Sequence, residues 1–173
     1  MISLTLPYPI SANRYWASRV VTVKGRQMPM VYVTSEAKAY IERVGWICKS
    51  AGIRQPLAGR LRVTVQLYPH RPQDWQARMR KFGANWDDTV QCMDLTNCEK
   101  VLLDALNTIA FNDDKQVRSY VADRMEPDEH GARVVLRIEP LIVVQPQADL
   151  LPALVAAPPA PAPFTPIPEG LPF

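Results

Sequence analysis

The chain has 173 residues, of which 47% are hydrophobic, and a formal net charge of +3. This length and composition suit one domain with a real core and an extension. No apolar run is long enough to span a membrane and the N-terminus is not a signal peptide, so we expect a cytoplasmic protein.

The charge distribution and the cysteine content give limited information about the binding partner and about the state of the thiols. No Lys or Arg follows Arg137, so the positive charge lies in the earlier residues, a modest basicity that is compatible with a polyanionic partner. Cys48, Cys92 and Cys98 are an odd number without a paired zinc-ligand spacing. We predict reduced thiols, with Cys48 and Cys98 facing the core.

The first segments indicate a strand followed by a basic region. Ile2, Leu4 and Leu6 alternate with polar residues, which predicts a strand buried on one face, and Pro7 ends it. Residues 10–33 are predicted to be irregular or a hairpin, with cations interleaved among aromatic residues. They form either a solvated loop or a flap that contacts DNA phosphates. The candidate DNA-binding residues here are Asn13, Arg14, Arg19, Lys24 and Arg26.

A helix, a strand and a long connection follow. Thr34 or Ser35 caps a helix that ends at Gly52, and residues 61–67 alternate as a second strand. Residues 70–93 are predicted to be a long loop, which is either mobile or functional. Cations beside aromatic residues suit contact with the DNA backbone and base stacking. The candidates are Arg71, Arg78, Arg80 and Lys81.

The stretch from Asp94 to Asp114 carries the chemistry. It predicts a helix with an apolar face, and with a polar stripe that includes Lys100 and Asp104. Thr96 or Asn97 is expected to cap the helix, which places Asp94 just before its positive end. If Asp113 and Asp114 lead into a strand packed beside the helix, their carboxylates can return towards Asp94. Carboxylates and a lysine at a helix start suit a magnesium ion and a phosphate, although caps and turns use the same residues.

Two final strands complete the expected fold. Residues 116–125 and 132–138 are predicted to be strands that pair with each other across a turn near Gly131. The order is then strand, helix, strand, helix, strand, strand. We predict an α+β domain over residues 1–139, with two helices on a small mixed sheet of about four strands. Residues 140–173, rich in Pro and Ala, are expected to be a disordered tail.

Three motifs of the central stretch resemble the core of the RusA family of Holliday junction resolvases. They are Asp-Leu-Thr-Asn-Cys-Glu-Lys at 94–100, Leu-Asp-Ala-Leu-Asn at 103–107 and Asn-Asp-Asp-Lys-Gln-Val at 112–117. The family shows Asp-x-Asp-Asn-x-x-Lys, Leu/Phe-Asp-Ala-Leu and Asp-Asp-x-Gln-Val. Residues 6–15, Leu-Pro-Tyr-Pro-Ile-Ser-Ala-Asn-Arg-Tyr, also resemble that family's N-terminal motif. The resemblance covers most of residues 1–139.

The resemblance implies an Mg²⁺-dependent endonuclease that resolves DNA four-way junctions, acts as a homodimer and serves recombination and repair. Asp94 and Asp114 would hold the metal and Lys100 would stabilise the transition state. The family's second aspartate is Thr96 here, and a hydroxyl is a weaker magnesium ligand than a carboxylate. Either the site works with fewer charges, or another acid compensates, or the enzyme is impaired. Further candidate metal ligands are Thr96, Asp104 and Asp113. The acids that could compensate for the missing aspartate are Glu99, Asp104 and Asp113.

Three interpretations therefore stand. The first is the active resolvase, the second a junction-binding protein that has lost nuclease activity through Thr96, and the third an unrelated scaffold module that binds partners through its tail. The last residues, Leu171-Pro172-Phe173, resemble the ending of bacterial single-stranded-DNA-binding proteins. This ending is a candidate contact with a repair partner, because a terminal Phe can fill an apolar pocket of the partner while its α-carboxylate binds a basic group there.

Overall fold

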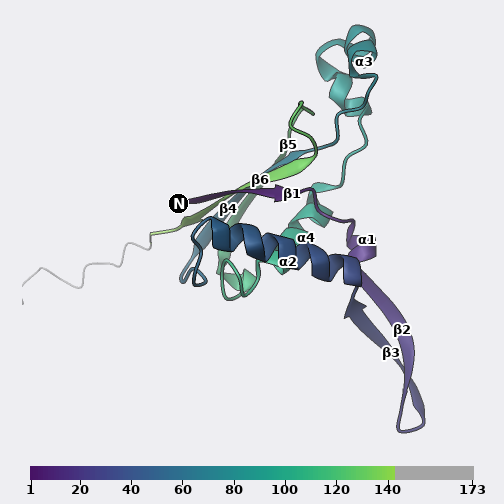
Figure 1. Cartoon of the computed structure of the whole chain (residues 1–173), viewed down its shortest axis with the longest axis vertical. Coiled ribbons are helices and arrows are strands. Elements are labelled where there is room, and N and C mark those ends of the chain that lie inside the picture. Colours follow the sequence, from purple (N-terminus) through teal and green to yellow (C-terminus); the bar gives the residue numbers. More distant parts are fainter. Residues whose placement is uncertain (143–173) are drawn as a thin grey trace, which may run out of the picture. The chain divides into compact units, whose positions relative to one another are not determined.

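A computed structural model describes residues 1–142 (Figure 1), so the expected tail and its Leu171-Pro172-Phe173 ending lie outside the described residues. Four strands form one mixed sheet in the order β1-β6-β4-β5. These are β1 (Ile2–Pro7), β4 (Leu61–Tyr68), β5 (Val117–Arg124) and β6 (Arg133–Pro140). Strand β6 runs antiparallel to β1 and β4, whereas β5 runs parallel to β4.

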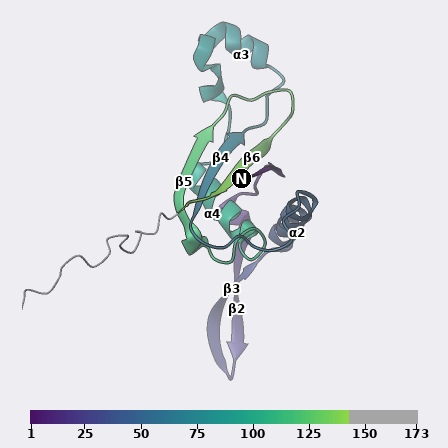
Figure 2. The same cartoon turned by 90° about the vertical axis from the view of Figure 1, so that its left-hand side faces the viewer.

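One face of this sheet is apolar because the alternating residues of neighbouring strands are in register. Leu136 of β6 pairs with Leu4 of β1 and with Val65 of β4, and all three side chains are buried. Two helices, α2 (Ser35–Ser50) and α4 (Leu95–Leu106), pack on this face (Figures 1 and 2). The predicted α+β class, with a four-stranded mixed sheet and two covering helices, is confirmed.

The predicted pairing of the last two strands is wrong. Strand β4 lies between β5 and β6, so β5 is an edge strand that bonds only to β4 in the sheet. The inner strands bury every second residue, as Val134, Leu136 and Ile138 do in β6. Strand β5 exposes Val121 and Asp123, which suits an edge. The connection between β5 and β6 is also much longer than a two-residue hairpin turn.

Helix α2 begins and ends as its sequence predicts. The Thr34 side chain accepts a hydrogen bond from the Ala37 N–H at 3.2 Å, which makes Thr34 the N-cap. Gly52 has a φ of 88°, a left-handed conformation that favours glycine. The N–H groups of Gly52 and Ile53 donate to the Lys49 and Cys48 carbonyls, and these bonds close the helix. Cys48 and Cys98 are fully buried, as predicted.

Two segments extend away from the four-stranded sheet at opposite ends in both views (Figures 1 and 2). At one end, α1 (Ala12–Tyr15) leads into a hairpin of β2 (Trp16–Val23) and β3 (Arg26–Val33). At the other end lie α3 (Trp75–Phe82) and the 3-10 segment η1 (Gly83–Thr89). The predicted hairpin is confirmed, whereas the long loop predicted over residues 70–93 is largely helical. Helix α3 could not be predicted from the sequence, because none of its residues is buried and the helix therefore has no apolar stripe that faces the core.

Within residues 1–142, no helix has both the length and the apolar composition needed to cross a membrane.

An ion pair stabilises the connection between β5 and β6. Arg133 donates two hydrogen bonds of 2.6 Å to the two carboxylate oxygens of Asp128, and its guanidinium lies 4.0 Å from the centre of the Tyr68 ring. The Arg133 hydrogen bonds are the largest of the effects that lower the pKa of Asp128 to about 2. The carboxylate therefore stabilises the folded state wherever it is ionised.

We predict that Asp128→Asn lowers the free energy of unfolding by about 1 kcal/mol at neutral pH, because it removes one partner of this pair. The folded-state pKa lies below the ordinary value of 3.8, so the stabilisation is complete above pH 4 and is lost as the pH falls towards 2. Urea unfolding of both proteins across this pH range measures the difference. Asp123→Asn is the control, since Asp123 is exposed and forms no salt bridge within residues 1–142. Equal stability of Asp128→Asn and the unmodified chain at pH 7 would contradict the prediction.

Candidate active site at the start of α4

Asp94 is the N-cap residue of α4, and its carboxylate is not used for capping. Its backbone is extended, with φ −63° and ψ 138°, and the helix begins at Leu95. The predicted cap at Thr96 or Asn97 is therefore wrong, because the backbone is already helical at both residues. The Asn97 amide lies 3.4 Å from Asp94 Oδ2, which is long for a hydrogen bond. Asp94 thus presents a carboxylate at the positive end of a helix.

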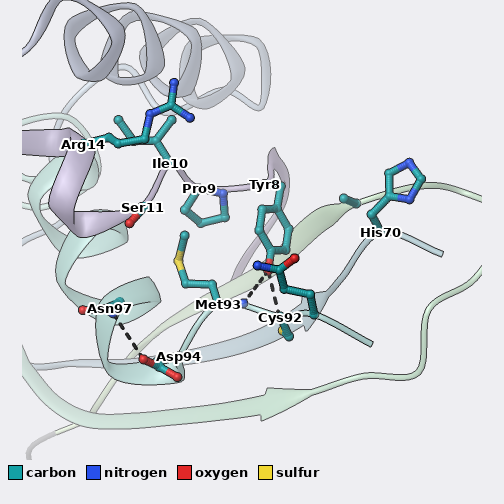
Figure 3. A pocket seen from close by; sticks show the side chains of 12 residues that line it. Tyr8, Pro9, Ile10, Ser11, Arg14, His70, Cys92, Met93, Asp94 and Asn97 are labelled. Carbon is teal, nitrogen blue, oxygen red and sulfur yellow. Dashed lines mark hydrogen bonds between the residues drawn. The ribbon is translucent and has the colours of Figure 1, made fainter. Parts of the chain in front are cut away.

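Asp94 and Asn97 line a hollow of about 480 Å³ (Figure 3). Its walls come from the segment after β1, from α1, from the residue His70 after β4, from the residues before α4 and its first turn, and from Ala132 before β6. Figure 3 shows Asp94 and Asn97 at one side of this hollow and His70 at another. The lining residues are Tyr8, Pro9, Ile10, Ser11, Arg14, His70, Gln91, Cys92, Met93, Asp94, Asn97 and Ala132.

The N-terminal motif fixes the point where α4 begins. The Tyr8 hydroxyl accepts a hydrogen bond of 2.9 Å from the Met93 N–H and lies 3.6 Å from Cys92 Sγ. The Tyr40 hydroxyl of α2 donates to the Pro7 carbonyl at 3.3 Å. Burial raises the pKa of Tyr8 to about 12, so the phenol is neutral at physiological pH. This structural role of Tyr8 could not be read from its motif alone.

A second group of polar side chains lies along α4. Lys100 Nζ is 4.4 Å from the centre of the Trp16 ring. Desolvation raises the pKa of the Asp104 carboxyl, Lys100 opposes that rise and Asp114 adds to it. Burial, with a smaller effect of Asp104, raises the pKa of Tyr15 to about 12. Lys100, Asp104 and Asp114 thus share one electrostatic environment with the aromatic pair at the end of α1.

Asp113 and Gln116 shape the turn that presents Asp114. The Asp113 carboxylate accepts a hydrogen bond from the Lys115 N–H at 2.9 Å, which is the largest of the effects that lower its pKa. The Gln116 side chain accepts from the N–H groups of Asn112 and Asp113 and donates to the carbonyls of Leu57 and Gly59. Asp113 is therefore engaged in the turn, while Asp114 is exposed.

The candidate ligand atoms are carboxylate oxygens, which are chemically suited to a hard divalent cation. Asp94, Asp104 and Asp114 form no salt bridge within residues 1–142, and carboxylate oxygens are the ligands that Mg²⁺ prefers. In that same part of the chain, no three His, Cys, Asp or Glu side chains come close enough to hold a metal ion together. Mg²⁺ commonly binds one or two carboxylates and keeps several waters, so a smaller donor set is sufficient.

The predicted DNA-binding residues of α1 and of the hairpin differ in how free their side chains are to contact DNA. Arg14 pairs with Glu36 at 2.8 Å although its side chain is 69% exposed, and Asn13, an uncharged residue, is also exposed. The remaining three form no salt bridge in the part of the chain that the structure describes, and all three are exposed. They are Arg19, which lies 5.5 Å from the Tyr32 ring, and Lys24 and Arg26 at the hairpin turn.

The cations of the α3 segment also divide into two sets. Arg78 donates to Asp74 and to the Thr89 carbonyl at 2.9 Å each. Arg71 pairs with Glu129 at 3.3 Å and lies 4.0 Å from the Trp75 ring. These two arginines hold the segment in place, while Arg80 and Lys81 are exposed and form no salt bridge within the described residues.

Trp86 anchors the same segment, a role that the sequence did not reveal. The side chain is 1% exposed, and its Nε1 donates to the Glu126 carboxylate at 2.7 Å. Arg124 of β5 donates to the carbonyls of Asp87 and Val90. The aromatic residues that looked available for base stacking therefore include one that is structural.

Comparisons with known proteins cover these same elements. A family model described as Endodeoxyribonuclease RusA matches residues 7–139. The chain is 33% identical over 137 residues to a protein named crossover junction endodeoxyribonuclease RusA from Escherichia coli (strain K12). That match covers 79% of this chain and 92% of the relative. A protein of the same name from Shigella sonnei (strain Ss046) is 32% identical over the same length.

Proposed function

Because this chain belongs to the RusA family of endodeoxyribonucleases, we propose that it is a crossover junction endonuclease. In this proposal it resolves Holliday junctions by paired hydrolysis of phosphodiester bonds during DNA recombination and repair. Family membership removes the interpretation as an unrelated scaffold module. The observation that carries the proposal is that the matched region contains Asp94, Lys100 and Asp114, none of them in a salt bridge within residues 1–142.

Mg²⁺ is the proposed cofactor, and when bound it activates a water molecule and offsets negative charge on the phosphate. Asp94 and Asp114 are the proposed ligands. Asp94 suits this role because its carboxylate is not used for capping. Asp104 and Thr96 are further candidates on α4, whereas Asp113 is already hydrogen-bonded in its turn.

Lys100 is the proposed electrostatic catalyst. Its ammonium is exposed on the polar side of α4, one turn beyond the helix start. A phosphodiester gains negative charge as water attacks, and a fixed cation stabilises that charge more than it stabilises the substrate. Lys100 would therefore act on the transition state or on the leaving oxygen.

The exposed cations on the two projecting segments are the proposed DNA contacts. Arg19, Lys24 and Arg26 of the hairpin, and Arg80 and Lys81 of α3, are available to bind phosphates. A four-way junction has two equivalent strands to cut, so a homodimer with two-fold symmetry fits the substrate. The proposed partners are thus a DNA junction and a second copy of this chain.

The alternative is a junction-binding protein without cleavage activity. Thr96 supports it, since a neutral hydroxyl stands where the family motif has an aspartate. A weaker metal site would leave phosphate binding by the cations unaffected while reducing hydrolysis.

We expect Asp94→Asn and Asp114→Asn each to lower cleavage of a synthetic four-way junction by about 100-fold or more, because each removes a metal ligand. Junction binding in chelator should be retained, since both changes remove negative charge near a phosphate. Cleavage with Mg²⁺ or with chelator, on the junction and on a matched linear duplex, is the measurement. Asp88→Asn is the matched control, as Asp88 is an exposed carboxylate of η1. Full cleavage by either site variant would remove that residue from the site.

Thr96→Asp tests the alternative. If Thr96 leaves the metal site short of charge, the added carboxylate should lower the Mg²⁺ concentration for half-maximal cleavage by about tenfold. Thr96→Asn, which adds a similar shape without charge, is the control. An unchanged or higher Mg²⁺ requirement would show that another group already supplies this contact.

Replacing both Arg80 and Lys81 with Ala should weaken junction binding and reduce the slope of log affinity against log salt by about 2 for each bound subunit, since each subunit loses two phosphate contacts. Arg78→Ala is the comparison, because Arg78 is engaged with Asp74 and Thr89. We expect this variant to loosen α3 with little change in the salt slope. A slope that is the same in the double variant and the unmodified chain would exclude the α3 cations from the DNA interface.

A further inference from the structure

The side chain of Lys100 rests on an aromatic ring that belongs to a different part of the chain. Trp16 is the first residue of β2, and the centre of its ring lies 4.4 Å from Lys100 Nζ. The face of an indole ring attracts an ammonium group, because its π electrons concentrate negative charge there. The Tyr15 ring packs beside Trp16, with the two ring centres 4.3 Å apart. Lys100 is thus placed by a contact from outside α4.

This contact competes with an ion pair inside the helix. Lys100 and Asp104 are four residues apart on α4, a spacing that brings oppositely charged side chains together. Asp104 experiences the charge of Lys100, but the two form no salt bridge within 4.0 Å in the described residues. The ammonium lies over Trp16 instead. An ion pair would reduce the positive charge available to a phosphate and the negative charge available to a cation.

The ring is held by the base of the hairpin. Trp16 pairs with Val33 across the two strands. The Thr34 N–H donates to the Tyr15 carbonyl at 3.0 Å, and the Thr34 hydroxyl donates to the Arg14 carbonyl at 2.7 Å. The backbone around Trp16 is therefore fixed independently of α4, so the ring can act as a rigid support for a flexible lysine.

We propose that Trp16 is a positioning residue for the nuclease reaction: its indole face holds the Lys100 ammonium away from Asp104 and so keeps both charges available to DNA and metal. This inference rests on the proposed function, since it explains the position of Lys100 by the catalytic role that the proposed function gives to this residue. It adds a residue of the N-terminal segment to the proposed catalytic set of Asp94, Lys100 and Asp114, which comes from α4 and the Asp114 turn.

The test compares Trp16→Leu and Trp16→Phe with the full, unmodified chain. Protons held over the face of an aromatic ring resonate upfield, so the ε-methylene protons of Lys100 report the contact directly by NMR in the metal-free protein. Trp16→Leu should abolish that upfield shift and lower the single-turnover rate of junction cleavage by about fivefold, leaving junction affinity unchanged. Trp16→Phe should keep part of the shift and stay within about twofold of the unmodified rate.

Trp46→Leu is the matched control. Trp46 of α2 is 63% exposed, and Lys49 Nζ lies 5.4 Å from the centre of its ring. The substitution thus removes another lysine–tryptophan contact, outside the proposed site. We expect it to change neither the Lys100 resonances nor the cleavage rate.

A folded Trp16→Leu variant that cleaves at the unmodified rate would overturn the proposal. So would an equal loss of rate in Trp16→Phe and Trp16→Leu, because the aromatic face would then be irrelevant. If Trp16→Leu does not fold, Trp16→Phe decides alone: a folded variant that loses the upfield shift or most of its cleavage overturns the proposal. Failure of the proposed function is a different result, namely no Mg²⁺-dependent junction cleavage by the unmodified chain, and the NMR shift would still report whether Trp16 holds Lys100.

Discussion

Cys98, Val101, Leu102, Ala105 and Leu106 of α4 are buried against the sheet, and this packing decides where every polar group of the helix points. Because a helix turns by about 100° per residue, burying these five side chains directs Lys100 and Asp104 away from the core. The bond between Tyr8 and the Met93 N–H fixes where the helix begins. Asp94 consequently lies at the helix start, at the edge of the hollow.

The arginines of this chain serve two purposes that their sequence context does not distinguish. Arg71, Arg78 and Arg133 make ion pairs that hold α3 and the β5–β6 connection in place. Arg80 and Lys81 lie on the same short helix as Arg78 and are exposed. A basic region therefore contains both cations that make ion pairs within the protein and exposed cations without such partners. Only the exposed cations contribute strongly to the attraction of a polyanion.

Part of the site could be predicted because helical periodicity and motif order are local properties of the sequence. The polar stripe with Lys100 and Asp104, and the placement of Asp114 after the helix, followed from spacing and from the resemblance to the RusA family. The helix cap could not be predicted in this way. Thr96 and Asn97 are good capping residues, but the backbone dihedrals at Asp94 place the N-cap two residues earlier than Thr96.

The sequence by itself determined the α+β class, the apolar faces of α2 and α4, and the candidate residues Asp94, Lys100 and Asp114, and it offered a hairpin as one of two possibilities for residues 10–33. Only the tertiary structure decided that β4 separates β5 from β6, that residues 75–89 are helical, and that Trp16 contacts Lys100. The physical reason is the range of the interactions involved. Periodicity, caps and turns depend on neighbouring residues, whereas strand order and a lysine on a distant ring depend on which surfaces meet when the core packs.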